Sequence, residues 1–281
     1  MNRKKLIARK IQEYWPVKIA KKNWYKDKNH KTFKGWTERE GTTDVADNQF
    51  AIHSQVFLKK RPFAFIVGCQ LDIGKKAWKA WRGPLMIAKE IGQQNFNPTY
   101  ISNMHAGTLR AVITRTRLGA RTLPAPRAAM NMKKLAELIC NEYGKKAQNI
   151  WEKAQSFDEL KERLFELPGF GVKLVNMTCK LLLELGMVPR LEKTIENMQN
   201  LNVAPDVHVK RVFYRSGLSN SMNTSDILKS AKEHLPRMPM ALDSAFFIGR
   251  EYCKKTKPNC RDCYLNKATN DTKICLRRKS E

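Results

Sequence analysis

The sequence predicts an all-α protein. Apolar residues recur at helical spacing through most of the chain, Pro and Gly residues mark helix boundaries, alternating β-branched runs are few, and no internal repeat is seen. With 281 residues and 42% apolar content, the chain can bury a core as one large or two smaller domains. Residues 1–50 are basic and aromatic without clear periodicity, so the pattern assigns them no element.

The expected elements follow in order along the chain. Residues 61–71 form an apolar run, buried as a helix or a strand, and the spacing in 74–92 favours a helix. The FNPT turn predicts the start of another helix, the proline-bounded stretch 121–127 predicts a loop, and the next helical pattern stops at Gly144. The remaining segments are two helices joined by a turn (156–186), an inserted connection with a short helix (187–205), and helices at 207–218 and 239–253.

The charge balance points to an anionic partner. Lys and Arg total 53 against 26 Asp and Glu, a formal net charge of +27, and residues 91–136 contain no acidic residue. Basic residues spread over a folded chain predict a positive face that suits nucleic acid, and the plainer alternative is a protein of unusually high pI. No apolar run approaches the roughly 20 residues that span a bilayer, and the N-terminus lacks an apolar signal core. We therefore expect no membrane segment and a cytoplasmic, nucleoid-associated protein, or a nuclear or mitochondrial one in a eukaryote.

The segment SFDELKERLFELPGFGVKLVNMTCKLLLELG carries the most specific local pattern. Ser156 and Glu159 form a capping box that starts one helix, Pro168 and Gly169 end it, and Gly171 permits a tight turn before a second helix. The N–H groups at the start of that second helix suit a phosphate, and such a contact is independent of base sequence. From the turn alone, an ordinary helix–turn–helix corner in a core is an equal alternative.

Three motifs in this order resemble the endonuclease III family of DNA glycosylases over residues 156–275. LPGFGVK resembles the family's helix-hairpin-helix signature, PDVHVKRV resembles its aspartate-containing helix start, and IGREYCKKTKPNCRDC resembles its cysteine cluster. The resemblance implies a two-domain all-α architecture, with residues 1–55 and 187–281 in one domain and 56–186 in the other. It also implies that Lys173 attacks C1′ of a flipped-out damaged nucleotide while Asp206 assists.

Further DNA contacts follow from the resemblance. Gln70, in GCQLD, aligns with a glutamine that fills the gap left by the flipped nucleotide, and Leu123 aligns with a leucine wedge. A loop glutamine and a loop leucine without such roles are equal alternatives on residue type alone. The other residues expected at DNA are those of the hairpin turn and of the basic loop before the last cysteines, namely Leu167, Gly169, Gly171, Lys254, Lys255 and Lys257.

The chemistry expected from these residues is base excision followed by strand cleavage. A glycosylase must extrude its target base, and a deprotonated lysine amine can displace that base to leave an iminium at C1′. The alternatives for Lys173 are a solvated helix lysine or a phosphate contact, and for Asp206 an N-cap, while His208 is expected to be structural. The whole-protein alternatives are a monofunctional glycosylase in which Asp206 activates water, and a non-enzymatic DNA-binding protein.

Four cysteines in the spacing C-x6-C-x2-C-x11-C predict a metal centre. Four thiolates suit a [4Fe–4S] cluster or a structural zinc, and spacing alone hardly separates them. The resemblance favours the iron–sulfur cluster, although the last interval is longer than the family's. The predicted ligands are Cys253, Cys260, Cys263 and Cys275, while Cys69, Cys140 and Cys179 are expected in the core.

The expected partner is double-stranded DNA that contains a damaged base or an abasic site, bound by a monomer. Oxidised or ring-saturated pyrimidines are the default substrate for a lysine-bearing member of the family. Two departures leave the substrate open. The interval between Lys173 and Asp206 is longer than in typical members, and Asp72 lies near, but not at, the position of the family's acidic residue.

Overall fold

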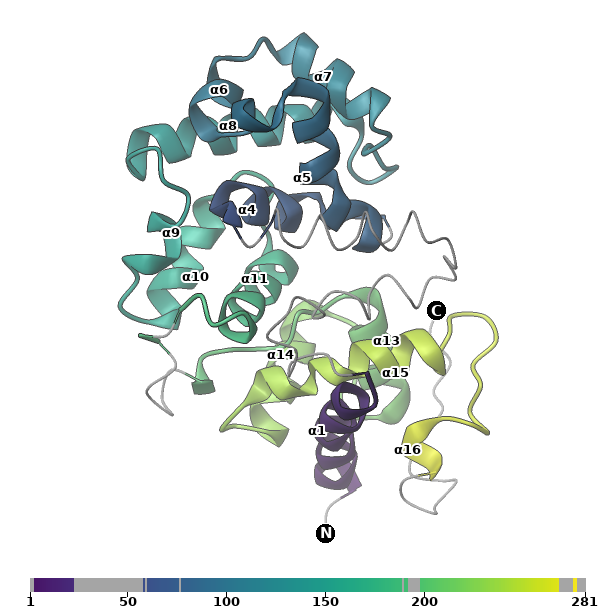
Figure 1. Ribbon diagram of the computed structural model, residues 1–281. Helices are drawn as coiled ribbons and strands as arrows, with labels where there is room; N and C mark the ends of the chain where they lie inside the picture. The colour runs from purple at the N-terminus through teal and green to yellow at the C-terminus, as the bar shows by residue number, and fades with distance from the viewer. Residues whose placement is uncertain are drawn as a thin grey trace. The chain divides into compact units, whose positions relative to one another are not determined.

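Helices are the regular elements of the part that the computed structural model describes, and no strand occurs there (Figure 1). The all-α prediction is therefore confirmed. None of the described helices is both long and apolar enough to cross a bilayer. Most of the segment 1–50 lies outside the description, apart from a helix near its start. The described residues are 3–22, 58, 60–75, 77–188, 190–191, 198–267 and 275–276.

The chain divides into two compact units. The hairpin unit comprises Lys22–Ala154 and Glu159–Leu174, and the terminal unit comprises Met1–Lys21, Gln155–Asp158 and Val175–Glu281. The division predicted after residue 55 lies outside the described residues, and the division predicted after residue 186 stays a prediction.

The hairpin unit is built around the apolar helix α4 and the amphipathic helix α8. α4 (Pro62–Leu71) begins with a proline at its first turn and is buried on every face from Phe63 to Leu71, as its continuous apolar sequence requires. It packs against α5 (Ala77–Ile91), whose Trp81 lies so close to Gly68 that a Cβ there would come within 2.9 Å of the indole. The segment 61–71 is thus a helix, not a strand.

α8 (Ala125–Glu142) carries the other half of this core. It buries one face against α4, α6 (Pro98–Asn103) and α7 (Ala106–Arg115), which Figure 1 shows grouped around it. The loop predicted at 121–127 is shorter than expected, because Pro124 occupies the N-cap position and α8 starts at the next residue. Besides these, the described residues 92–184 form η2 (Gln93–Asn95), α9 (Asn149–Glu152), α10 (Phe157–Glu166) and α11 (Val172–Glu184), and the division between the two units runs through α10 and α11.

The terminal unit packs α13 (Val207–Ser216) against α15 (Ala245–Glu251). The two helices approach closely because Gly249 has no side chain: a Cβ there would lie 2.7 Å from the carbonyl oxygen of His208. The unit also contains α14 (Thr224–His234), η3 (Pro239–Ser244) and α16 (Tyr264–Lys267). α14 was not anticipated from the sequence.

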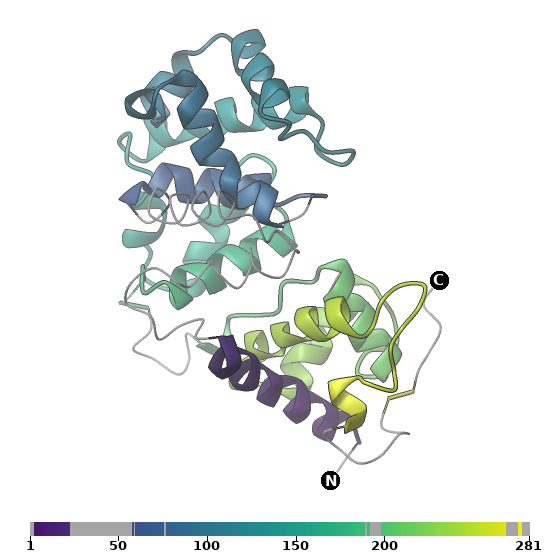
Figure 2. The ribbon, with the colours of Figure 1, turned by 45° about the vertical axis from the view of Figure 1, so that its right-hand side comes forward.

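The helix near the N-terminus, α1 (Arg3–Lys22), belongs to this terminal unit. It lies beside α16 in both views (Figure 2), and the ring of Tyr14 contacts that of Tyr264 in a tilted arrangement, with centroids 4.6 Å apart. The Tyr14 hydroxyl also donates to the Glu251 carboxylate at 2.6 Å. These contacts join the start of the chain to its last described helices.

Candidate active site

The hairpin turn between α10 and α11 is anchored by its apolar residues and open at its glycines. Leu167 and Phe170 are buried, whereas Gly169 and Gly171 are exposed. Gly169 has φ +82°, and a Cβ there would lie 2.5 Å from the Asn131 side-chain nitrogen, so only glycine fits. Gly171 differs: its φ is not positive, and no atom lies within 4 Å of an added Cβ. The need for a special backbone conformation therefore lies at Gly169, not at Gly171 as the sequence suggested.

The side chain of Gln70 is hydrogen-bonded to the backbone of this turn. Its side-chain nitrogen donates to the carbonyl oxygens of Pro168, at 2.7 Å, and Asn131, at 3.1 Å. The side chain is only 1% exposed. Gln70 thus connects α4, α8 and the hairpin within this unit, and its predicted insertion into DNA stays a prediction.

Lys173 lies in the first turn of α11. Its amine donates to the backbone carbonyl of Asp72 at 2.8 Å, and one Asp72 carboxylate oxygen lies 3.8 Å away. The lysine side chain is 35% exposed and that of Asp72 is 10% exposed. The amine is therefore held by one firm hydrogen bond and one longer ionic contact, with one side open to solvent.

The sequence reasoning gave no role to Asp72, which contacts Lys173, or to Lys75, which lies near Asp72. Burial raises the pKa of the Asp72 carboxyl, and the nearby Lys173 and Lys75 ammonium groups oppose that rise. Burial lowers the pKa of Lys75 to about 8, although Asp72 acts in the opposite direction. The Lys75 amine also donates to the Leu118 carbonyl, so it is fixed in place. A carboxyl group thus lies beside the predicted nucleophile, and a second amine lies close enough to that carboxyl group to affect its pKa.

Leu123 does not have the exposure that a DNA wedge needs. It is 2% exposed, and reciprocal backbone hydrogen bonds with Ala120 close the loop that precedes α8. The exposed residues of this loop are Arg121 and Thr122, and Thr122 packs over Gly74. The wedge role assigned to Leu123 remains a prediction, and burial counts against it.

Asp206 is the N-cap of α13. One carboxylate oxygen accepts hydrogen bonds from the N–H groups of His208 and Val209, both at 2.8 Å. The cap satisfies two donors that an α-helix start otherwise leaves without a partner, and it places the carboxylate at the positive end of the helix dipole. Asp206 is half-buried, and the next residue, Val207, is 64% exposed.

His208 joins α13 to α15. Its ring Nδ1 lies 2.9 Å from the Arg211 guanidinium, which can only donate, and the same guanidinium donates to the Gly249 carbonyl at 3.2 Å. Burial and the adjacent Arg211 lower the pKa of His208. A neutral ring whose Nδ1 accepts from the guanidinium fits this arrangement, and it agrees with the structural role expected for this histidine.

The basic loop after α15 is shaped by Arg215. The Arg215 guanidinium donates to the carbonyl oxygens of Lys254, at 2.7 Å, and Lys255, at 2.9 Å. Backbone hydrogen bonds from Lys254 and Asn259 to the Tyr252 carbonyl close the loop, at 3.0 and 2.8 Å. Lys254, Lys255 and Lys257 are all exposed. Fixed backbone and exposed ammonium groups suit contact with phosphates.

Two of the four C-terminal cysteines contact the same arginine. The Cys253 sulfur lies 3.7 Å from the Arg215 guanidinium, and the Cys275 thiol donates to the Arg215 carbonyl at 3.3 Å. Burial raises the pKa of Cys263 to about 11, with Cys275 and Cys253 contributing through their charge. The donor chemistry fits a four-thiolate centre, although no described residues form a group of three or more potential ligands in metal-binding geometry. Of the cysteines expected in the core, Cys69 and Cys179 are buried and Cys140 is half-buried.

Comparison with known proteins defines the fold. Three similar solved structures are a non-covalent endonuclease III–DNA complex, a trapped endonuclease III–DNA covalent intermediate and a thermostable thymine-DNA glycosylase. Their identities to this chain are 19%, 20% and 14%, and their TM-scores are 0.53, 0.52 and 0.50. The three matches cover 76%, 73% and 80% of this chain, and 83%, 81% and 96% of the length of the other protein. The chain therefore has the endonuclease III-like helix-hairpin-helix fold, as predicted. No family model and no curated sequence matches it.

Proposed function

We propose that the protein is a DNA glycosylase of base-excision repair with AP-lyase activity. The observation that carries this proposal is the position of Lys173. It lies in the first turn of the second hairpin helix, with its amine held at the Asp72 carbonyl and partly open to solvent. The fold that it shares with DNA complexes of endonuclease III supports DNA as the substrate.

In the proposed reaction, the amine of Lys173 attacks C1′ of a flipped-out deoxynucleotide, and the base leaves with the bonding electrons and a proton. The bond from C1′ to O4′ then opens, with a proton going to O4′, and an iminium forms at C1′. Loss of a C2′ proton breaks the bond from C3′ to its phosphate oxygen, the phosphate leaves with the bonding electrons, and water hydrolyses the iminium to free Lys173. Asp206 stabilises positive charge on the sugar and assists the proton transfers. The proposal requires Lys173 and Asp206 to act on the same nucleotide.

The phosphate backbone is bound by groups of both units. In the hairpin unit, the open space at the exposed Gly171, next to the start of α11, leaves room for a phosphate. In the terminal unit, Lys254, Lys255 and Lys257 supply positive charge from a loop of fixed shape. Such contacts make affinity depend steeply on salt and little on base sequence.

Cys253, Cys260, Cys263 and Cys275 are proposed to hold a [4Fe–4S] cluster, with zinc as the alternative. When bound, either metal supplies a cross-link that closes the segment carrying the basic loop. This chain's own contribution is Arg215, which contacts Cys253 and Cys275 and also fixes the loop carbonyls. Iron, sulfide and zinc analysis of the purified protein, with its visible absorption, separates the two metals.

Two other functions are kept as alternatives. A monofunctional glycosylase that acts on damaged or mismatched bases, with Asp206 activating water, is favoured by the similarity to a thymine-DNA glycosylase. A non-enzymatic DNA-binding protein needs only the hairpin, the basic loop and a structural metal.

A panel of duplexes separates these functions. The panel contains oxidised pyrimidines, deaminated bases, mismatches and an abasic site, each incubated with and without borohydride. Base release with a covalent adduct supports the proposal, base release without an adduct supports the monofunctional enzyme, and salt-sensitive binding without base release supports the DNA-binding protein.

A further inference from the structure

The segment that leads into Asp206 is buried but has no regular structure. Residues 201–205 are all buried, although they belong to no helix. From residue 202 on, their N–H groups have no helix ladder to supply acceptors, and a buried N–H without a partner is strongly unfavourable. The position of Asp206 therefore depends on what accepts these hydrogen bonds.

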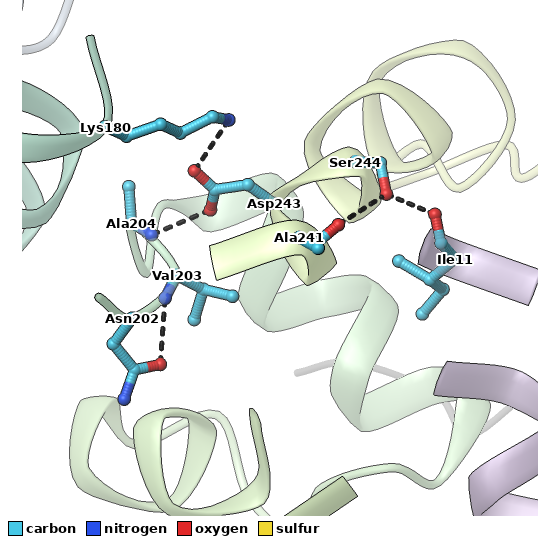
Figure 3. Close-up of polar contacts among 8 residues, drawn as sticks. All are labelled: Ile11, Lys180, Asn202, Val203, Ala204, Ala241, Asp243 and Ser244. Atoms are coloured by element: carbon cyan, nitrogen blue, oxygen red, sulfur yellow. Dashed lines mark hydrogen bonds and ion pairs between the residues drawn. The ribbon is translucent and has the colours of Figure 1, made fainter. Parts of the chain in front are cut away.

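A tight turn and two side chains supply the acceptors, and Figure 3 shows the two side chains, Asn202 and Asp243. The Val203 N–H donates to the side-chain oxygen of Asn202 at 2.8 Å, and the Ala204 N–H donates to the Asp243 carboxylate at 2.7 Å. Pro205 has no N–H, and the Asp206 N–H donates back to the Ala204 carbonyl at 2.7 Å. Every N–H from residue 203 to residue 206 thus has a partner.

Asp243 is the central residue of this arrangement. Its second carboxylate oxygen accepts from the Lys180 amine at 2.9 Å, and the two side chains are 7% and 13% exposed. Asp243 is itself fixed, because the next residue, Ser244, donates to the Ala241 carbonyl at 3.1 Å and to the Ile11 carbonyl of α1. All of these residues belong to the terminal unit.

We propose that Asp243, held by Lys180, is the positioning residue that sets the placement of Asp206 for catalysis. Asp243 fixes the Ala204 amide, and the Ala204 carbonyl fixes the Asp206 amide, so the cap residue cannot move without breaking one of two buried hydrogen bonds. A buried ion pair is a weak source of stability but a strict geometric constraint. This inference rests on the proposed role of Asp206.

The sharpest test separates two properties of the Asp243 side chain, its hydrogen-bond acceptor for the Ala204 N–H and its negative charge. Lys180→Met with Asp243→Asn removes both charges and retains an oxygen that can accept from the Ala204 N–H. Lys180→Met with Asp243→Leu removes the charges and the acceptor while keeping a side chain of similar size. Both double variants avoid a buried charge without a partner, which single substitutions would create.

The expected result is a selective loss of chemistry. Misplacement of a reacting group by about 1 Å can reduce rates by about 10²-fold. We expect the Leu variant to release base about 10²-fold more slowly than the Asn variant, with duplex affinity within a few-fold. In an Asp206→Asn background the same exchange should have no further effect. Equal rates in the two variants, or a loss that multiplies with Asp206→Asn, would overturn the inference.

A second variant and a second measurement keep the inference testable if the Leu variant does not fold or if no base is released. If the Leu variant does not fold, Asn202→Ala removes a neighbouring acceptor and should slow base release in the same direction, again without effect in the Asp206→Asn background. If the wild type releases no base from any duplex, the proposed function fails. Amide hydrogen exchange then tests the geometry: the Ala204 and Asp206 amides should lose protection in the Leu variant but not in the Asn variant, and equal protection contradicts the inference.

Discussion

The two predicted catalytic residues are held in different ways. Lys173, in the hairpin unit, makes one hydrogen bond to a backbone carbonyl and one long ionic contact, and its side chain is 35% exposed. Asp206, in the terminal unit, accepts two backbone hydrogen bonds and follows a buried segment whose N–H groups are satisfied by fixed side chains. The Lys173 amine is thus held mainly by one hydrogen bond. The Asp206 carboxylate is held by the N–H groups of its helix and by the fixed backbone before it.

This difference matches the chemistry proposed for each group. A nucleophile must break its resting contacts and move to form a covalent bond, so few and replaceable contacts suit it. A carboxylate that stabilises developing charge works best when it needs no reorganisation. The comparison therefore predicts that substitutions near Lys173 slow the covalent step. Substitutions near Asp206 should slow base release by displacing the carboxylate.

The largest effect is expected from Lys173→Gln. The covalent adduct and strand cleavage should fall by about 10³-fold or more, because the nucleophile is lost. Borohydride trapping on an abasic duplex measures the adduct. Lys134→Gln, at an exposed lysine of α8, is the control and should leave trapping unchanged. An undiminished adduct in Lys173→Gln contradicts the assignment of the nucleophile.

Asp206→Asn should reduce base release by about 10²–10⁴-fold, the contribution typical of a positioned acid–base group. Because Asn is as good an N-cap as Asp, the free energy of unfolding should change by less than about 0.5 kcal/mol. Asp206→Ala should lose activity and also about 1 kcal/mol of stability. Single-turnover kinetics with denaturant unfolding measure both effects. Normal base release by Asp206→Asn would leave capping as the residue's whole role.

In the hairpin unit, which carries Lys173, the two glycines of the turn offer a matched pair of substitutions. Gly169→Ala should lower stability by about 1–3 kcal/mol, because it combines a left-handed φ with a clash at Asn131. Gly171→Ala should barely change stability but should weaken duplex binding several-fold, because its methyl group occupies space that the protein leaves open. Thermal unfolding and binding titrations check the pair. Similar losses of stability in both variants would show that the turn, rather than DNA, requires the second glycine.

In the terminal unit, which carries Asp206, the basic loop offers the corresponding test of DNA contacts. Lys254→Ala and Lys257→Ala should each weaken binding to all duplexes alike and reduce the salt slope of log affinity by about 1. Lys232→Ala, at an exposed lysine of α14, is the control. Titrations at several salt concentrations measure the slope. A loss confined to particular base sequences would contradict a phosphate contact.

The smallest expected effect concerns Lys75. Its folded-state pKa of about 8 lies below the unfolded value of 10.5, so between these pH values the unfolded chain binds more protons. Wild-type stability should therefore rise with pH in this window relative to Lys75→Met, and the contribution should be lost as pH falls through 8. Denaturant unfolding at pH 7.5 and pH 9.5 measures the difference. A constant gap between the two proteins would show that the amine is not desolvated.

The sequence predicted what depends on local pattern. The helix starts after Ser156 and Asp206 follow from capping residues, and the LPGFGVK turn follows from its glycines and proline, because these signals act over a few neighbouring residues. Residues 61–71 stayed ambiguous between helix and strand because their apolar run has no periodicity.

The sequence could not predict contacts between distant segments. Asp72 and Lys173 are far apart in the chain, as are Lys180 and Asp243, and no local spacing brings either pair together. The burial of Leu123 was missed for a similar reason, since alignment with a motif gives a position but not an exposure. Arg215 was overlooked because arginines are common in this chain, and only its contacts to loop carbonyls and cysteine sulfurs distinguish it.

The most direct test of the account identifies the residue that forms the covalent bond. The protein is trapped on an abasic duplex with borohydride and digested, and the nucleotide-bearing peptide is sequenced by mass spectrometry. The account predicts a reduced adduct on the Lys173 side chain. An adduct on Lys75 or on the N-terminal amine, or the absence of any adduct in a protein that still releases base, would contradict it.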